Sequence, residues 1–314
     1  MIPVGDIRRA ADVISDAAVR TPLVREPFPD APCEIWLKLE CLQPIGAFKI
    51  RGAVNAVRQA PSDALAAGVV TASAGNMAQA VAWAAREAGV GATVVAPDHA
   101  PEVKVAAIEQ LGARVVKVPF ERWWQALVEG RVDGHEGLFL HPVSDPLVMA
   151  GNGTIGLEIA SELEPDTVVV PVGGGGLLSG IASALQVASP RTRIVAVEPE
   201  TAAPLAASLA RGEPTEVVYR PSFVDGAGGR SILPGMWPLL GELVTEAVTV
   251  SLEETANAVR VLLERARVVA EGAGALATAA ALAGKAGSGR VVCIVSGGNI
   301  DLPVLARIAG GDVP

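Results

Sequence analysis

The chain has 314 residues, half of them hydrophobic, so it can bury a large core and is expected to form one large domain or two modest ones. Its 25 Lys and Arg residues against 34 Asp and Glu residues give a net charge of −9, which speaks against a nucleic-acid partner. The nearly uncharged helical stretch 273–284 is far shorter than the roughly 20 residues of a membrane span. The N-terminus lacks the apolar stretch of a secretory signal, so we expect a cytoplasmic protein with no membrane partner.

Along the chain, short β-branched runs alternate with longer Ala-rich segments of helical period. Continuous apolar runs such as 167–170 are typical of strands that are covered on both faces, and the helices between them predict an α/β fold with parallel sheets. The expected strand and helix pairs, in chain order, are 69–72 with 78–88, 92–96 with 102–111, 114–118 with 122–128, 137–140 with 156–163, and 167–172 with 177–187. A strand over 193–197, helices over 252–265 and 274–283, and a strand over 291–295 complete the pattern.

Four consecutive glycines, residues 173–176, follow the expected strand 167–172 and precede a helix. Without Cβ atoms, their N–H groups can converge on an anion, and the helix N-terminus adds partial positive charge. We interpret this loop as a phosphate cradle; the alternative is a tight turn that binds no ligand. Segments 151–156 and 272–277 match the glycine spacing of dinucleotide sites, but neither precedes a strand with the acidic residue that contacts a ribose, so nucleotide binding there is the weaker hypothesis.

Two further polar loops follow expected strands. In Ser73-Ala-Gly-Asn76, the hydroxyl and amide groups beside a helix start suit a carboxylate or a ring hydroxyl, although helix capping alone would explain Ser73. Ser296 begins the loop Ser-Gly-Gly-Asn after the strand 291–295. Since ligands of open α/β sheets bind where loops leave the strands, these loops are expected to meet at one crevice.

Lys49 lies among apolar and small residues, directly after Phe48. A lone lysine is usually a solvated surface group. A desolvated lysine with a lowered pKa, however, suits a Schiff base with an aldehyde cofactor. The scattered cysteines and histidines show no metal or disulfide spacing, so we expect no metal site and assign no histidine a catalytic role.

Taken together, these motifs with Glu271 resemble, in order and spacing, the pyridoxal-phosphate enzymes of fold type II, in particular the threonine dehydratase and serine racemase family. The resemblance runs from about residue 16 to residue 305. It implies a tryptophan synthase β-like fold with two open, twisted, mostly parallel sheets. The implied domains are a large one from 1–61 and 145–314 that binds the cofactor and a small one over 62–144, and the implied assembly is a homodimer.

The resemblance also implies pyridoxal 5′-phosphate as the cofactor, joined to Lys49, with Phe48 against its ring. Asn76 would contact the ring hydroxyl, Ser296 the pyridine nitrogen, and the glycine loop the phosphate. The cofactor-binding residues expected on this basis are Phe48, Lys49, Asn76, Gly173, Gly174, Gly175, Gly176, Leu177, Gly226, Glu271 and Ser296. The expected substrate-binding residues are Ser73, Ala74, Gly75, Asn76 and Met77, with Lys49 and Ser73 as catalytic residues.

The implied activity is that of a lyase: a dehydratase, or ammonia-lyase, that eliminates water from a β-hydroxy amino acid such as threonine or serine and yields a 2-oxo acid and ammonia. A neutral serine at the pyridine nitrogen favours elimination over transamination, with Lys49 as the Cα base. The alternatives are a serine-type racemase, a dehydratase for a bulkier or acidic β-hydroxy amino acid, and a nucleotide-binding or non-catalytic protein. Ala74 favours elimination, because the racemases of the family carry a serine hydroxyl at that position.

Three departures from the family pattern concern specificity and metal binding. Met77 stands where the family usually has histidine, and Val224 replaces the usual alanine before Asp-Gly. Where metal-binding members supply an aspartate six residues after a glutamate, this chain has Pro204 after Glu198, so no divalent metal is expected. The chain ends soon after Asp301, which predicts no C-terminal regulatory domain.

Overall fold

The computed structural model describes residues 1–244 and 246–314. The strands are β1 (Leu23–Glu26), β2 (Glu34–Lys38), β3 (Val69–Ala72), β4 (Ala92–Pro97), β5 (Arg114–Val118), β6 (Leu138–Phe139), β7 (Thr167–Pro171), β8 (Arg193–Pro199), β9 (Glu246–Val250) and β10 (Arg290–Ile294). The α-helices are α1 (Val4–Val13), α2 (Lys49–Gln59), α3 (Asn76–Glu87), α4 (Glu102–Gln110), α5 (Phe120–Glu129), α6 (Pro146–Glu162), α7 (Gly176–Ala188), α8 (Pro204–Arg211), α9 (Trp237–Leu243), α10 (Leu252–Val261), α11 (Gly272–Leu282) and α12 (Leu302–Ala309). A 3₁₀ turn, η1, spans Glu40–Leu42, and a π-helical turn, η2, spans Leu262–Ala266.

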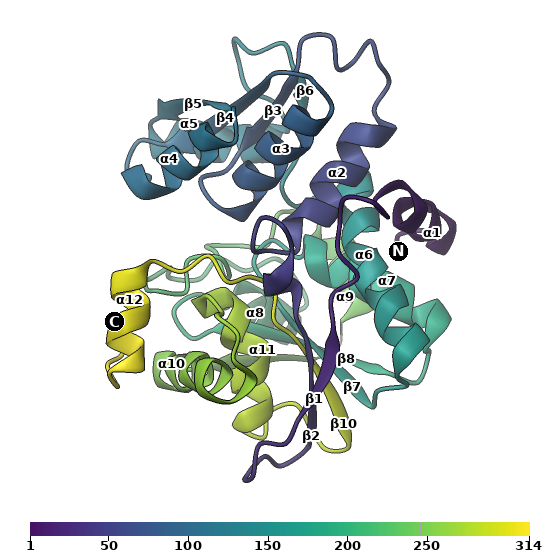
Figure 1. The fold of residues 1–314 in the computed structure, drawn as a ribbon, viewed down its shortest axis with the longest axis vertical. Helices are drawn as coiled ribbons and strands as arrows, with labels where there is room; N and C mark the ends of the chain where they lie inside the picture. The colour runs from purple at the N-terminus through teal and green to yellow at the C-terminus, as the bar shows by residue number, and fades with distance from the viewer. Residues whose placement is uncertain (245) are drawn as a thin grey trace.

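The strands form two sheets. The six-stranded sheet has the order β1-β2-β10-β7-β8-β9 and is parallel except for the antiparallel pair β1 and β2. The four-stranded sheet, β5-β4-β3-β6, is parallel throughout. Figure 1 shows it at the top of the molecule, with α2 between it and the larger sheet below. The predicted fold class, α/β with two mostly parallel sheets, is confirmed.

The larger sheet is buried on both faces, as its apolar strands predict. In β7, Val168 and Val170 pack with residues of α1, α6 and α7, whereas Val169 packs on the opposite face with residues of α10 and α11. Side chains alternate between the two faces of a strand, so a run without any polar residue requires two apolar layers of helices.

The helix expected over 156–163 begins ten residues earlier, as α6. Asp145 caps its N-terminus by accepting hydrogen bonds from the N–H groups of Leu147 and Val148, and glycines lie inside it. A Cβ on Gly151 would clash with the backbone of Arg51. These glycines therefore allow close packing of helices and do not end the helix.

The weaker hypothesis of nucleotide binding at 151–156 and 272–277 is wrong. Segment 151–156 lies in the buried interior of α6, and segment 272–277 forms the buried first turns of α11. Neither is the turn between a strand and a helix that a dinucleotide fingerprint requires. In the second segment, a Cβ on Gly274 would clash with the carbonyl of Gly297. The glycine spacing there also reflects close packing.

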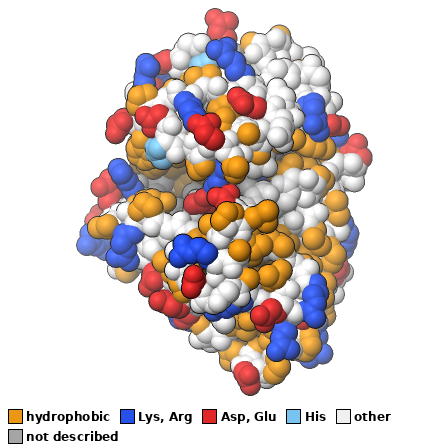
Figure 2. Space-filling model, turned by 60° about the vertical axis from the view of Figure 1, so that its left-hand side comes forward, with side chains coloured by type: hydrophobic (Ala, Val, Ile, Leu, Met, Phe, Trp, Pro, Cys, Tyr) orange, Lys and Arg blue, Asp and Glu red, His pale blue; other side chains and the backbone are white. Residues whose placement is uncertain are grey.

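The four-stranded sheet lies within residues 69–139, inside the predicted small domain of 62–144, whose limits stay a prediction. Acidic and basic side chains are interspersed on the face shown in Figure 2. In the part of the chain that the structure describes, no helix combines the length and the apolar character needed to cross a membrane.

Candidate active site

A cavity of about 660 Å³ lies between the two sheets, where loops leave the C-terminal ends of β3, β7 and β10. It brings together residues from distant parts of the chain, as the position of such loops predicts. All the residues that the sequence analysis selected line it: Phe48, Lys49, Ser73, Ala74, Gly75, Asn76, Met77, Gly173, Gly174, Gly175, Gly176, Leu177, Gly226, Glu271 and Ser296. Their individual roles stay predictions.

Lys49 is the first residue of α2, and its side chain is held inside the cavity. Its Nζ donates a hydrogen bond of 2.8 Å to the carbonyl of Pro142 and lies 5.1 Å from the ring centroid of Phe48. Burial lowers the pKa of Lys49 to about 8. Among the described residues it is the only lysine without a carboxylate partner. A half-buried amine with a lowered pKa suits reaction with an aldehyde.

A buried network of charges fixes the first turn of α2, and with it Lys49. Arg51, whose side chain is 1% exposed, donates hydrogen bonds of 2.8 and 2.9 Å to the two oxygens of Glu40 and one of 2.6 Å to Glu158. Lys38 pairs with Glu158 at 2.5 Å. Sequence reasoning missed this network, because its members come from β2, η1, α2 and α6 and share no motif.

The glycine loop fits a phosphate group. Gly175 caps α7 with φ of 94°, and a Cβ at Gly174 would clash with Val143. In the described part of the chain, no protein acceptor takes the backbone N–H groups of Gly174 to Leu177, and no side chain caps α7. Free donors at a helix N-terminus beside a cavity are what a phosphate requires. With Lys49 facing the same cavity, these residues fit a phosphate-bearing aldehyde cofactor.

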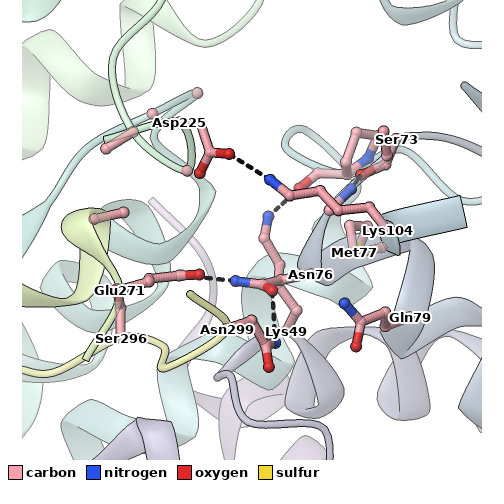
Figure 3. A pocket seen from close by; sticks show the side chains of 18 of the residues that line it. Lys49, Ser73, Asn76, Met77, Gln79, Lys104, Asp225, Glu271, Ser296 and Asn299 are labelled. Atoms are coloured by element: carbon pink, nitrogen blue, oxygen red, sulfur yellow. Dashed lines mark hydrogen bonds and ion pairs between the residues drawn. The ribbon is translucent and has the colours of Figure 1, made fainter. Parts of the chain in front are cut away.

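Hydrogen bonds connect the loops after β3 and β10 and the start of α11 across the cavity (Figure 3). Asn76 donates a bond of 2.8 Å to Glu271 and accepts one of 2.8 Å from Asn299. Burial and the charge of Asp225 raise the pKa of Glu271 to about 7. The two hydrogen bonds orient the amide of Asn76. The hydroxyl of Ser296, by contrast, has no hydrogen-bond partner among the described residues and is available to a ligand.

Two contacts that the sequence did not reveal join segments on opposite sides of the cavity, and the first of them is made by two residues that line it. Lys104 of α4 forms an ion pair with Asp225 (Figure 3). The guanidinium of Arg230 lies 5.2 Å from the ring centroid of Phe120 on α5. Both join the smaller sheet's helices to the loop after Val224 that contains the predicted residue Gly226.

His141, to which the sequence analysis assigned no role, supports the loop that holds Lys49. Its Nδ1 accepts hydrogen bonds of 3.0 Å from the N–H groups of Val143 and Ser144, and its Nε2 lies 2.8 Å from the carbonyl of Leu127. This pattern requires a neutral ring with its proton on Nε2, and burial lowers the pKa of His141 in agreement. The loop that it holds contains Pro142.

We expect His141→Gln to weaken cofactor retention more than His141→Asn. Asparagine keeps an acceptor near the position of Nδ1, whereas glutamine replaces only Nε2 and leaves two loop N–H groups unpaired, at about 1–3 kcal/mol each. Equilibrium dialysis against pyridoxal phosphate measures retention, and thermal unfolding of both variants provides the control. Equal retention by the two variants would contradict this role of Nδ1.

Glu198, the residue considered for a metal site, caps a helix instead. It accepts hydrogen bonds of 3.0 and 2.8 Å from the N–H groups of Leu205 and Ala206 at the start of α8. Burial raises the pKa of Glu198 to about 7. The described residues contain no group of three His, Cys, Asp or Glu side chains suited to a metal ion.

Comparisons with known proteins show the family of this chain. The model of the family "Pyridoxal-phosphate dependent enzyme" matches residues 14–297. An L-threonine ammonia-lyase of Geobacter sulfurreducens is 42% identical, over 98% of this chain and 78% of that protein. Threonine deaminase isoform 2 from Solanum lycopersicum has a TM-score of 0.89 at 31% identity, covering 98% of this chain and 91% of that one. A maize serine racemase has a TM-score of 0.84 at 32% identity, covering 97% and 95%.

Proposed function

The chain belongs to the family of pyridoxal-phosphate dependent enzymes, and from this premise we propose that it removes water from L-threonine or L-serine to give a 2-oxo acid and ammonia. The enzyme is a lyase of the threonine dehydratase type and uses pyridoxal 5′-phosphate. The observation that carries the proposed chemistry is Lys49, a half-buried lysine without a carboxylate partner among the described residues, which faces the glycine loop across one cavity.

A residue of this chain can be assigned to each proposed step. When bound, pyridoxal phosphate supplies an aldehyde for an amine and a ring that accepts negative charge from Cα. The substrate carboxylate binds at Ser73 and the N–H groups at the start of α3. Lys49, with its pKa near 8, holds the cofactor and then takes the proton from Cα. The hydrogen bond to Pro142 keeps this amine in place.

Release of 2-oxo acid from L-threonine and L-serine by the holoenzyme tests the proposal, with D-threonine as the control substrate. We expect 2-oxobutyrate and pyruvate in equal amount to the ammonia released. If no β-hydroxy amino acid yields a 2-oxo acid, the proposed function is wrong.

The racemase alternative depends on Ala74. A racemase must deliver a proton to the face of Cα opposite its lysine, and the methyl group of Ala74 can neither donate nor accept one. We therefore expect oxo acid to form faster than D-serine when L-serine is the substrate. Ala74→Ser should raise the ratio of inversion to elimination, by roughly 10-fold or more if the new hydroxyl acts as a general acid. Chiral chromatography alongside an oxo-acid assay measures both products, and faster inversion by the wild type would favour the racemase.

We also propose that the protein is a cytoplasmic homodimer, as the family resemblance implies. Cys33, Cys41 and Cys293 form no disulfide in the structure, which fits a reducing compartment. Light scattering of the holoenzyme during gel filtration gives its mass in solution.

A further inference from the structure

We propose that the substrate site extends onto an apolar wall of the cavity, and that the substrates include β-hydroxy amino acids with an aryl group or another bulky apolar group on Cβ. The apolar wall consists of Ala72, Ala74, Ala100, Trp123 and Leu127, all of which line the cavity. This inference rests on the proposed dehydratase activity and names the substrate class of that same site.

The apolar wall lies beside the loop proposed to bind the substrate carboxylate. Ala72 and Ala74 flank Ser73 in the sequence. Ala72 packs in one hydrophobic cluster with Leu127 and the half-buried Trp123. Ala74 packs in a second cluster with residues of β4 and of α4 and the loop between them. A substrate whose carboxylate is bound at Ser73 therefore has apolar surface on both sides of that contact.

The wall also lies close to the proposed base. The carbonyl of Leu127 is 2.8 Å from Nε2 of His141, and the next residue after His141 is Pro142, whose carbonyl accepts the hydrogen bond from Lys49. Leu127 and Lys49 thus line the same cavity and are connected through the segment His141–Pro142.

The shape of the wall suits a ring better than a methyl group. Ala74 is only half-buried and carries a single methyl group, and Trp123 and Leu127 lie one turn apart on the same face of α5. The Trp123 ring is packed against Phe120, with a centroid distance of 5.5 Å, which holds it in position. An indole face and alkyl groups bind aromatic rings through burial of apolar surface and through offset or edge contacts.

The charges favour an apolar substituent over an acidic one. Of the side chains that line the cavity between residues 69 and 143, only Lys104 carries a permanent charge. Its ammonium is already paired with Asp225, which also lines the cavity. A second substrate carboxylate would therefore find no unpaired cation on this side and would lose its hydration.

The reaction remains the elimination already proposed. The Cα–H bond breaks with transfer of its proton to Lys49. The Cβ–O bond breaks, and the leaving hydroxide takes up one proton and departs as water, so the net loss is one water. Hydrolysis of the resulting enamine takes up one water and releases ammonia. For β-phenylserine, the products are phenylpyruvate and ammonia, so atoms balance without any oxidant or reductant.

The test compares L-threo-β-phenylserine with L-threonine in the holoenzyme, in Trp123→Ala and in Trp124→Ala. Trp124 is the matched control, because it is the next residue of α5, is half-buried against the same hydrophobic cluster as Trp123, and does not line the cavity. We expect turnover of phenylserine by the wild type, and a loss of its kcat/KM of about 10-fold or more in Trp123→Ala, with little change for threonine. Trp124→Ala should leave the ratio of the two substrates unchanged.

Binding measurements separate a specificity role from general damage. L-Phenylalanine and L-2-aminobutyrate lack the β-hydroxyl and cannot lose water, so calorimetric titration of the holoenzyme reports their affinities directly. Trp123→Ala should weaken binding of phenylalanine alone. If the enzyme turns over threonine but neither turns over nor binds the aryl compounds, the proposed role of the apolar wall is wrong and the proposed function stands. Equal losses for both substrates in Trp123→Ala would lead to the same conclusion. Absence of turnover with every substrate would refute the proposed function itself.

Discussion

Replacing Lys49 with alanine should lower kcat by about 10²–10⁴-fold, the usual contribution of a general base, and should also loosen the cofactor. Lys49 has only the Pro142 carbonyl as a hydrogen-bond partner, so its removal strands no buried carboxylate and should leave folding nearly unchanged. Stopped assays of oxo-acid release and thermal unfolding of the same preparation measure the two effects.

The other lysines serve as internal controls for this assignment. Lys38, Lys104, Lys117 and Lys285 each have a carboxylate partner in the structure. Borohydride reduction of the holoenzyme followed by peptide mapping should therefore label Lys49 alone. Label on another lysine, or full activity in Lys49→Ala, would refute Lys49 as the residue that holds the cofactor.

Replacing Gly173 with aspartate should weaken cofactor affinity strongly while the fold persists. A Cβ at Gly173 meets no atom nearer than 3.5 Å, so the residue has room, and it lines the cavity beside the free N–H groups. The new carboxylate would repel a phosphate, and loss of one charge-assisted contact costs about 1.5–3 kcal/mol, or roughly 10- to 150-fold in affinity. Spectroscopic titration of the apoenzyme with pyridoxal phosphate measures this change.

Gly173→Ala is the matched control, because it adds the Cβ without the charge and should change affinity far less. Gly175→Asp would be a poorer test: Gly175 has φ of 94°, and its Cβ would lie 2.7 Å from Leu240, so folding would suffer as well. If the aspartate and alanine variants at Gly173 retain the cofactor equally well, the loop is not a phosphate cradle.

The residue pattern by itself determined the α/β class and the loops that form the cavity, whereas the two-sheet fold was implied by the family resemblance. These features are local: an apolar run such as 167–170 requires cover on both faces, and a run of glycines after a strand leaves N–H groups free. Helix limits inside glycine-rich segments were less predictable. The start of α6 was missed because Gly151 and its neighbours reflect contact with α2 and α7, which a single segment does not show.

Only the tertiary structure decided what surrounds the cavity. The hydrogen-bond partner of Lys49 is the backbone carbonyl of Pro142. Every residue has such a carbonyl, so the sequence does not show which one a lysine will contact. Lys104 and Asp225 are 121 residues apart, and their ion pair depends on how the helices of one sheet face a loop of the other. The apolar wall is likewise assembled from separate elements. The packing of distant segments decides which apolar side chains border a cavity and which enter a core, and the periodicity within a single segment does not show this.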